Sequence, residues 1–128
     1  MSDASWIIGK AVRGKGRGTK LGFPTANLEL SNVKQRPAEG VYAARVKLAD
    51  DKKPRLAAAH VGPVPTFNQK KPTVEVHILD FPYQELYGQE LAVQFVEKVA
   101  DIKKFDSIDD LKKRIQQNVD RVREVLTS

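Results

Sequence analysis

The sequence predicts a small antiparallel β-barrel, closed or nearly closed, with a single helix at its C-terminus. Over about the first hundred residues, β-branched and aromatic residues alternate with polar ones in short runs separated by Gly, Pro and Asp, as in half-buried strands. The end of the chain changes to a spacing of three and four residues, the period of an α-helix. Several short antiparallel strands followed by one covering helix are typical of a small barrel.

Strand patterns are clear in residues 6–12, 41–48, 56–61, 73–81 and 91–96, with a weaker sixth at residues 26–30. In the segment 41–48 every second residue is apolar from Tyr42 onward, and in the segment 91–96 the apolar positions begin at Leu91. This alternation indicates antiparallel strands with one face toward a core. Turn-forming residues separate them, including a long Pro-rich loop at 61–72 and a turn near Gly88.

The C-terminal helix has one apolar face and a clear beginning. Ser107 is a natural N-cap, and Asp109 and Asp110 follow in the first turn, where negative charge suits the helix dipole. We expect the apolar face to pack on the barrel. Its residues are Ile108, Leu111, Ile115, Val119, Val122 and Leu126.

Length and composition indicate one cytoplasmic domain. The 128 residues suit a single core, and we expect the barrel at about 6–97 and the helix at about 107–126. The chain lacks cysteine, which excludes a disulfide framework and a thiolate zinc site. No apolar run has the length of a signal peptide core or a membrane span, so we expect no membrane partner.

The stretch "GKGRGTKLGFPTANLEL" combines four glycines with basic residues and a Pro-Thr-Ala-Asn sequence. Such residues suit a polyphosphate with its metal ion, but also nucleic acid or an elaborate turn. A P-loop is excluded, because Gly16 stands where Ser or Thr is needed and no helix pattern follows. If the loop binds phosphate, it does so as a nest of backbone amides. The net charge of +6 is compatible with both a phosphate ligand and a nucleic acid, so it does not decide between them.

The segment "TVEVHILDF" places Glu75 and His77 on one strand face and apolar residues on the other. From the residues alone, Glu75 is read as an exposed strand residue. His77 and His60 lack a third well-spaced ligand, so ordinary hydrogen-bonded histidines are favoured over a metal site.

The order and spacing of several motifs resemble one family. "GRGTKLGFPTANLEL", "EGVYAARV", "HVGPVPTFNQKKPTVEVHILDF", "LYGQELAVQF" and "KKFDSIDDLKKRI" follow one another as do the blocks of the ATP-dependent riboflavin kinase (flavokinase) family. The resemblance covers nearly the whole chain. It implies a six-stranded antiparallel barrel of Greek-key type with a C-terminal helix, and transfer of the γ-phosphate of ATP to the ribityl 5′-hydroxyl of riboflavin, giving FMN and ADP.

The resemblance also assigns roles. Glu75 is expected to be the general base, and Thr25 and Asn27 to hold Mg²⁺, with Zn²⁺ or Mn²⁺ as alternatives. Phe105, Ile102 and Leu111 are expected to contact the flavin. The residues expected to bind the nucleotide are Gly14, Lys15, Gly16, Arg17, Gly18, Lys20, Gly22, Tyr87 and Gly88.

Four positions depart from the family pattern. Ala100 and Val64 replace an Arg, Ile102 replaces a Glu, and Asn118 replaces an acid, which puts flavin affinity in question. The alternative reading is therefore a flavin- or nucleotide-binding module with weak or no kinase activity. A barrel binding single-stranded nucleic acid is disfavoured, because basic and aromatic residues do not interleave along the strands. We expect a monomer without the adenylyltransferase domain of many bacterial relatives.

Overall fold

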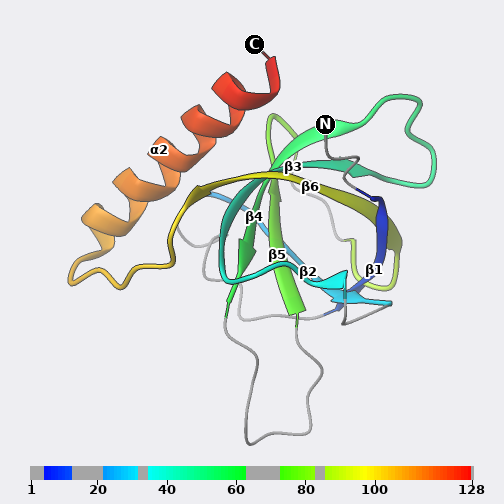
Figure 1. The fold of residues 1–128 in the computed structure, drawn as a ribbon, viewed down its shortest axis with the longest axis horizontal. Helices are drawn as coiled ribbons and strands as arrows, with labels where there is room; N and C mark the ends of the chain where they lie inside the picture. Colours follow the sequence, from blue (N-terminus) through cyan, green and yellow to red (C-terminus); the bar gives the residue numbers. More distant parts are fainter. Residues whose placement is uncertain (1–4, 13–21, 32–34, 63–72, 83–85, 128) are drawn as a thin grey trace, which may run out of the picture.

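The computed structural model of the chain describes residues 5–12, 22–31, 35–62, 73–82 and 86–127. Within these residues it forms a closed six-stranded antiparallel barrel with one C-terminal helix (Figure 1), as the sequence predicts. The strands follow the order β1-β2-β5-β4-β3-β6 around the barrel. The elements are β1 (Ile7–Val12), β2 (Ala26–Leu30), β3 (Gly40–Lys47), β4 (Arg55–Val61), β5 (Thr73–Ile78), β6 (Glu90–Ala100) and α2 (Ile108–Thr127).

The barrel contains a Greek key. Strands β3, β4 and β5 are consecutive in the chain and neighbours in the sheet, and β6 returns to pair with β3 on its other side. This gives the spatial order β6-β3-β4-β5, which defines the motif. Pairing of β6 with β1 then closes the barrel.

Two predicted strand boundaries were wrong. The strand predicted at 73–81 ends at Ile78, because the chain turns at Leu79 and Asp80, where Asp80 has a left-handed φ of 55°. The strand predicted at 91–96 continues to Ala100, since β6 keeps pairing with β3 through two shifts of register. The barrel therefore ends later than the predicted residue 97. The other strands lie within one residue of their predicted bounds.

The barrel interior holds the larger of two apolar clusters. Each strand turns alternate residues inward, as in Val74 and Val76 of β5, which are 0% and 1% exposed. Ala57 and Ala59 of β4 are fully buried in the same cluster. The alternation seen in the sequence is therefore the inside and outside of the barrel wall.

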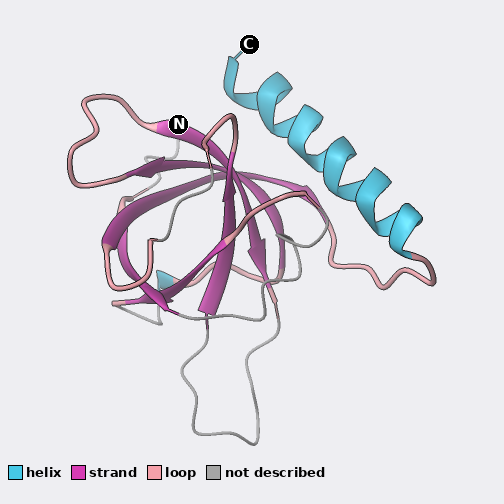
Figure 2. Cartoon of the chain, turned by 180° about the vertical axis from the view of Figure 1, so that it is seen from behind, coloured by secondary structure: helices cyan, strands magenta, loops and turns pink. Residues whose placement is uncertain are grey.

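Helix α2 packs on the outside of the barrel through a second cluster. Val119 and Val122 are buried there against Ala43 of β3 and Leu79. Figures 1 and 2 show the helix along one side of the barrel, with its N-terminal end reaching beyond the strands. Ile108 is consequently 66% exposed, so the prediction that it packs in the core was wrong. The packed face lies in the C-terminal half of the helix.

Polar contacts fix both ends of α2. The Asp110 amide donates to Ser107 Oγ at 3.1 Å, which confirms Ser107 as the N-cap. Near the other end, Arg123 donates two hydrogen bonds to the carboxylate of Asp80, at 2.7 and 2.8 Å. The helix is thereby tied to the turn that follows β5.

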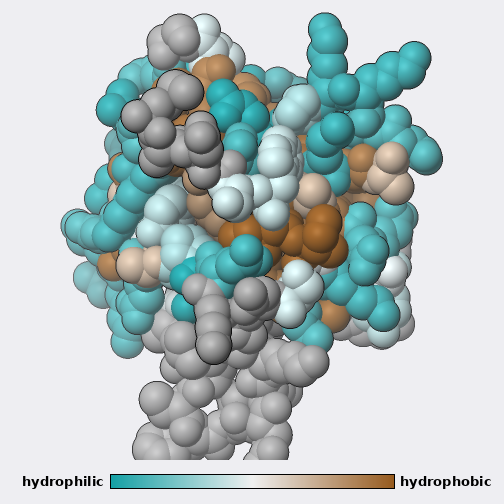
Figure 3. Space-filling view, turned by 45° about the vertical axis from the view of Figure 1, so that its right-hand side comes forward, coloured by the Kyte–Doolittle hydropathy of each residue, from teal (hydrophilic) through white to brown (hydrophobic). Residues whose placement is uncertain are grey.

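Hydrophilic side chains cover most of the face seen in Figure 3, around a smaller apolar area. Large apolar side chains that remain exposed include Ile8 and Val96 on the strands and Trp6 just before β1. Among the described residues, no helix has the length and hydrophobicity needed to cross a membrane.

Candidate functional site

A row of side chains crosses the outer wall of the barrel. Asn27 of β2 lies directly opposite Glu75 of β5, and Glu75 lies opposite His60 of β4. Their chain neighbours Leu28, Val74 and Val61 point inward and are fully buried, so these three polar residues face outward. Asn27 and Glu75 are half-buried and His60 is exposed.

The same row continues across two more strands. His60 lies opposite Val41 of β3, and Val41 lies opposite Ala100, the last residue of β6. Neighbouring strands are about 4.8 Å apart, so the five positions from Asn27 to Ala100 extend about 19 Å along the curved surface. We call this set, Asn27, Glu75, His60, Val41 and Ala100, the outer row. It is polar at the β2 end and apolar at the β6 end.

The segment before β2 is held in place by His77. The Nδ1 atom of His77 lies 2.8 Å from the backbone oxygen of Pro24, and because a carbonyl can only accept, this nitrogen carries the hydrogen. The ring of Phe23 meets the His77 ring edge-on, with centroids 5.5 Å apart. These contacts fix the Pro24–Thr25 segment beside β5. His77 is thus the hydrogen-bonded histidine that the sequence favoured.

Thr25 and Asn27 offer the oxygens for a metal ion. Asn27 lies in β2, and Thr25 directly precedes that strand; both residues are half-buried. Magnesium prefers oxygen ligands and is usually held by few side chains together with substrate phosphates and water. A hydroxyl and an amide carbonyl fit Mg²⁺ or Mn²⁺ better than Zn²⁺, which favours nitrogen and sulfur.

The glycine-rich loop leaves and rejoins the barrel next to Asn27. Its residues Gly14, Lys15, Gly16, Arg17, Gly18 and Lys20 lie outside the described residues. Val12 at the end of β1 pairs with Asn27 itself. Gly22, where the described chain resumes, has a left-handed φ of 88° that favours glycine. The described end of β1 therefore lies beside Asn27, at the β2 end of the outer row.

Tyr87 and Gly88 lie beside the end of β1. The Gly88 amide donates to the Ala11 carbonyl, and the Ala11 amide donates to the Gln89 carbonyl, both at 2.8 Å. Tyr87 is 54% exposed. These contacts bring the turn before β6 close to Ala11 near the end of β1. The nucleotide-binding role of Tyr87 and Gly88 stays a prediction.

The expected flavin residues follow the other end of the row. The chain runs from Ala100 through Ile102 and Phe105 into α2, and both side chains are half-buried. Leu111 in the second turn of α2 is also half-buried, and the ammonium of Lys103 lies 5.9 Å from the centre of the Phe105 ring. The structure therefore separates the expected metal and flavin residues and places Glu75 between them.

Comparison with known proteins decides the family. A model of the flavokinase family, described as riboflavin kinase, matches residues 3–126. The chain belongs to the riboflavin kinase family. A bifunctional riboflavin kinase/FMN adenylyltransferase of Haemophilus influenzae is 37% identical over 122 residues, which cover 95% of this chain and 39% of the relative.

Two solved structures resemble this riboflavin kinase family member. One is described as a macrolide-efflux protein from Streptococcus pneumoniae, with a TM-score of 0.81 and 34% identity over 94% of this chain and 38% of the other. A riboflavin kinase from Trypanosoma brucei has a TM-score of 0.69 and 24% identity, covering 96% of this chain and 80% of the other. The second likeness shows the shared fold. The chain spans about two fifths of the Haemophilus and Streptococcus proteins.

Three of the four departures from the family pattern lie in the C-terminal part of the described chain, as do the residues expected to contact the flavin. Ala100 ends the outer row, Ile102 follows it, and Asn118 is half-buried on α2. Val64 lies outside the described residues. Thr25, Asn27 and Glu75, which are predicted to hold the metal and to act as the base, all lie within the described residues.

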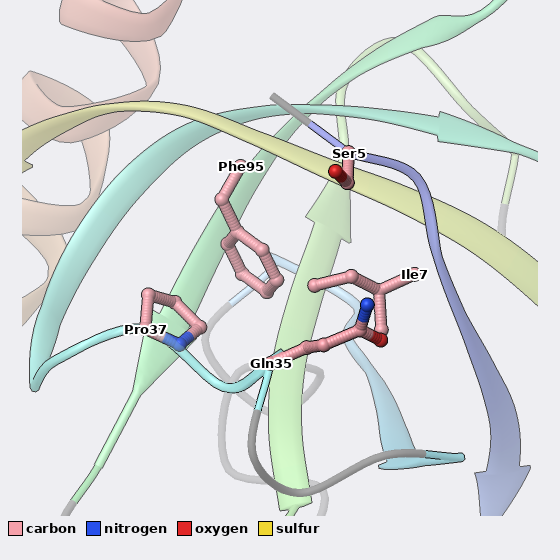
Figure 4. Close-up of a pocket in the computed structure, with 5 residues that line it drawn as sticks. All are labelled: Ser5, Ile7, Gln35, Pro37 and Phe95. Atoms are coloured by element: carbon pink, nitrogen blue, oxygen red, sulfur yellow. The ribbon is translucent and has the colours of Figure 1, made fainter. Parts of the chain in front are cut away.

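A cavity of about 260 Å³ lies apart from the outer row, at a mouth of the barrel (Figure 4). Phe95 of β6 and Ile7 of β1 point toward it from the inner wall, and Gln35 lies across from them. Ser5 and Pro37 complete the lining. None of the predicted site residues that the structure describes is among the residues that line this cavity.

Sequence reasoning missed two relations in the site. His77 was not connected with Pro24, which is 53 positions away, and His60 was not placed beside Glu75. Both relations depend on which strands are neighbours and in what register. No pattern within one strand carries that information.

Proposed function

We propose that this chain transfers the γ-phosphate of ATP to the 5′-hydroxyl of the ribityl chain of riboflavin, giving FMN and ADP. The observation that carries the proposal is the direct cross-strand pairing of Asn27 with Glu75 on the outer wall. This pairing brings Asn27, which is expected to bind the metal ion near the phosphates, next to the carboxylate of Glu75. Membership of the riboflavin kinase family supports the same reaction.

In the proposed reaction, Glu75 accepts the hydroxyl proton as the alcohol oxygen forms a bond to the γ-phosphorus. The bond between that phosphorus and the bridging oxygen breaks, and ADP leaves. General-base catalysis contributes about 10²- to 10⁴-fold to a rate. Thr25 and Asn27 would hold Mg²⁺, which when bound would neutralise charge on the transferred phosphoryl group. The chain's own task is mainly to position both substrates.

The outer row gives the substrates a direction. We place the nucleotide at the β1 and β2 end, where Gly88 contacts Ala11 and Val12 pairs with Asn27. The flavin ring lies at the β6 end, near Ile102, Phe105 and Leu111. The ribityl chain then runs along the row toward Glu75.

The test is FMN formation from riboflavin and Mg·ATP by the purified protein, followed by chromatography of the flavins. Glu75→Gln removes the base with little change of shape and should lower the rate by about 10² to 10⁴. Glu29→Gln is the matched control. Glu29 lies two residues after Asn27 on the same outer face of β2, but it is not part of the outer row. It should leave the rate within a few-fold. Equal losses in both variants, or full activity in Glu75→Gln, would remove Glu75 from the mechanism.

A second candidate is a flavin- or nucleotide-binding module with little or no kinase activity. The observation in its favour is that Ala100 and Ile102 stand on the flavin side without the charges that the family pattern has there. Riboflavin binding without FMN formation would establish it. A closed barrel presents no free edge strand for pairing, so in either case we propose a monomer.

A further inference from the structure

We infer that His60 binds the ribityl chain of the acceptor by a hydrogen bond to one of its hydroxyls. This inference rests on the proposed function. It adds a residue that neither the motifs nor the family roles above include. His60 matters because it adjoins the proposed base on the side away from the proposed metal.

The order of strands determines which substrate His60 can reach. Glu75 has Asn27 on its β2 side and His60 on its β4 side. The phosphoryl group comes from the Asn27 side, so the alcohol must approach Glu75 from the opposite side. An acceptor extended along the outer row therefore crosses β4 at His60. His60 lies two strand steps, about 10 Å, from Asn27, which is too far for direct contact with the metal or its ligands.

The chemistry of the row fits a chain of hydroxyls joined to a flat ring. On the outer face of β4, His60 follows Leu56 and Ala58, and it is exposed. A neutral imidazole has one donor and one acceptor, which suits an alcohol that can do both. Beyond it come two apolar positions, Val41, which is 8% exposed, and Ala100, which is half-buried and precedes Ile102 in the chain. The row thus changes from polar to apolar where the acceptor would change from sugar alcohol to ring.

His60 lies near the end of β4, close to Gly62, and is exposed. Its Cε1 atom lies 3.8 Å from the position that a Cβ on Gly62 would occupy. Arg36 donates to the Gly62 carbonyl and is a charged group beside this end of β4. Glu75 is the titratable group facing His60 from β5. Because His60 is exposed, its replacement should leave the barrel intact.

The experiment compares binding of two flavins, measured by quenching of their fluorescence in the presence of Mg·ADP. Riboflavin has the ribityl chain, and lumiflavin has the same ring with a methyl group in its place. His60→Ala should weaken riboflavin binding by about 2- to 12-fold, the range for one neutral hydrogen bond, and leave lumiflavin binding unchanged. His60→Gln keeps a donor and an acceptor and should restore most of the loss. Ile8→Ala, an exposed strand residue on β1, is the control.

Steady-state kinetics give an independent readout. His60→Ala should raise the KM for riboflavin and leave the KM for ATP within two-fold. Equal weakening of both flavins, or unchanged riboflavin binding in His60→Ala, would overturn the inference even if the parent makes FMN. A parent that binds riboflavin but makes no FMN would refute the kinase proposal, and the flavin comparison would still decide for or against His60. A parent that binds no riboflavin would overturn both.

Discussion

The docking of α2 on the barrel should depend on Val122. This side chain is 0% exposed in the second apolar cluster. Val122→Ala removes two buried carbons, worth about 1.6 kcal/mol of transfer free energy, and the cavity left behind adds to this. Alanine is the better helix former by a few tenths of a kcal/mol, which offsets part of the loss. We expect the free energy of unfolding to fall by about 2 kcal/mol.

Urea denaturation followed by circular dichroism measures this loss. Ile108→Ala is the matched control, because Ile108 lies on the same helix but is 66% exposed. Its effect should stay within about 0.5 kcal/mol, as for most surface substitutions. If Ile108→Ala costs as much as Val122→Ala, the helix does not pack through its C-terminal half and the account of the second cluster is wrong.

Two further predictions concern the polar contacts of α2. The hydrogen bonds from Arg123 lower the pKa of Asp80 below its ordinary value of 3.8. Because the folded-state pKa is the lower one, the stabilisation is present above about pH 4 and is lost as the pH falls through the folded pKa. Urea midpoints of the parent and Arg123→Ala should therefore differ at neutral pH and converge in acid, and a constant difference would contradict this. Ser107→Ala should cost about 1 kcal/mol of stability and Ser107→Asp should not; equal urea midpoints for the parent and Ser107→Ala would refute the cap.

The fold was largely predictable because the strands and the helix are marked by patterns of residues close together in the sequence. Alternation marked which residues of each strand face inward, and a change of period marked the helix. The predicted strand boundaries were wrong where strand pairing and turns in the folded chain, not the sequence pattern, decide where a strand ends. Ile78, Leu79 and Phe81 are residue types common in strands, so the predicted strand ran on to residue 81. The chain turns before Phe81, which instead packs against the barrel core with Arg55 over its ring. β6 extends past Val96 because β3 continues to pair with it.

The candidate site was predictable only in part. Motif resemblance supplied Thr25, Asn27 and Glu75 one at a time, but not their arrangement. That Asn27 and Glu75 are partners follows from β2 pairing with β5, two strands far apart in sequence. The position of His60 beside Glu75 has the same origin. Residue type suggests chemistry, and strand register decides which residues can act together.

The central claim is that Asn27 and Glu75 form one phosphoryl-transfer site. The measurement that tests it most directly is the rate of FMN formation by Asn27→Ala, Glu75→Gln and the double variant, under saturating riboflavin and Mg·ATP. Residues that act as a unit are strongly non-additive, so the double variant should be no slower than the slower single variant, within about three-fold. Losses that multiply would show that the two residues act independently, and unimpaired single variants would contradict the claim outright.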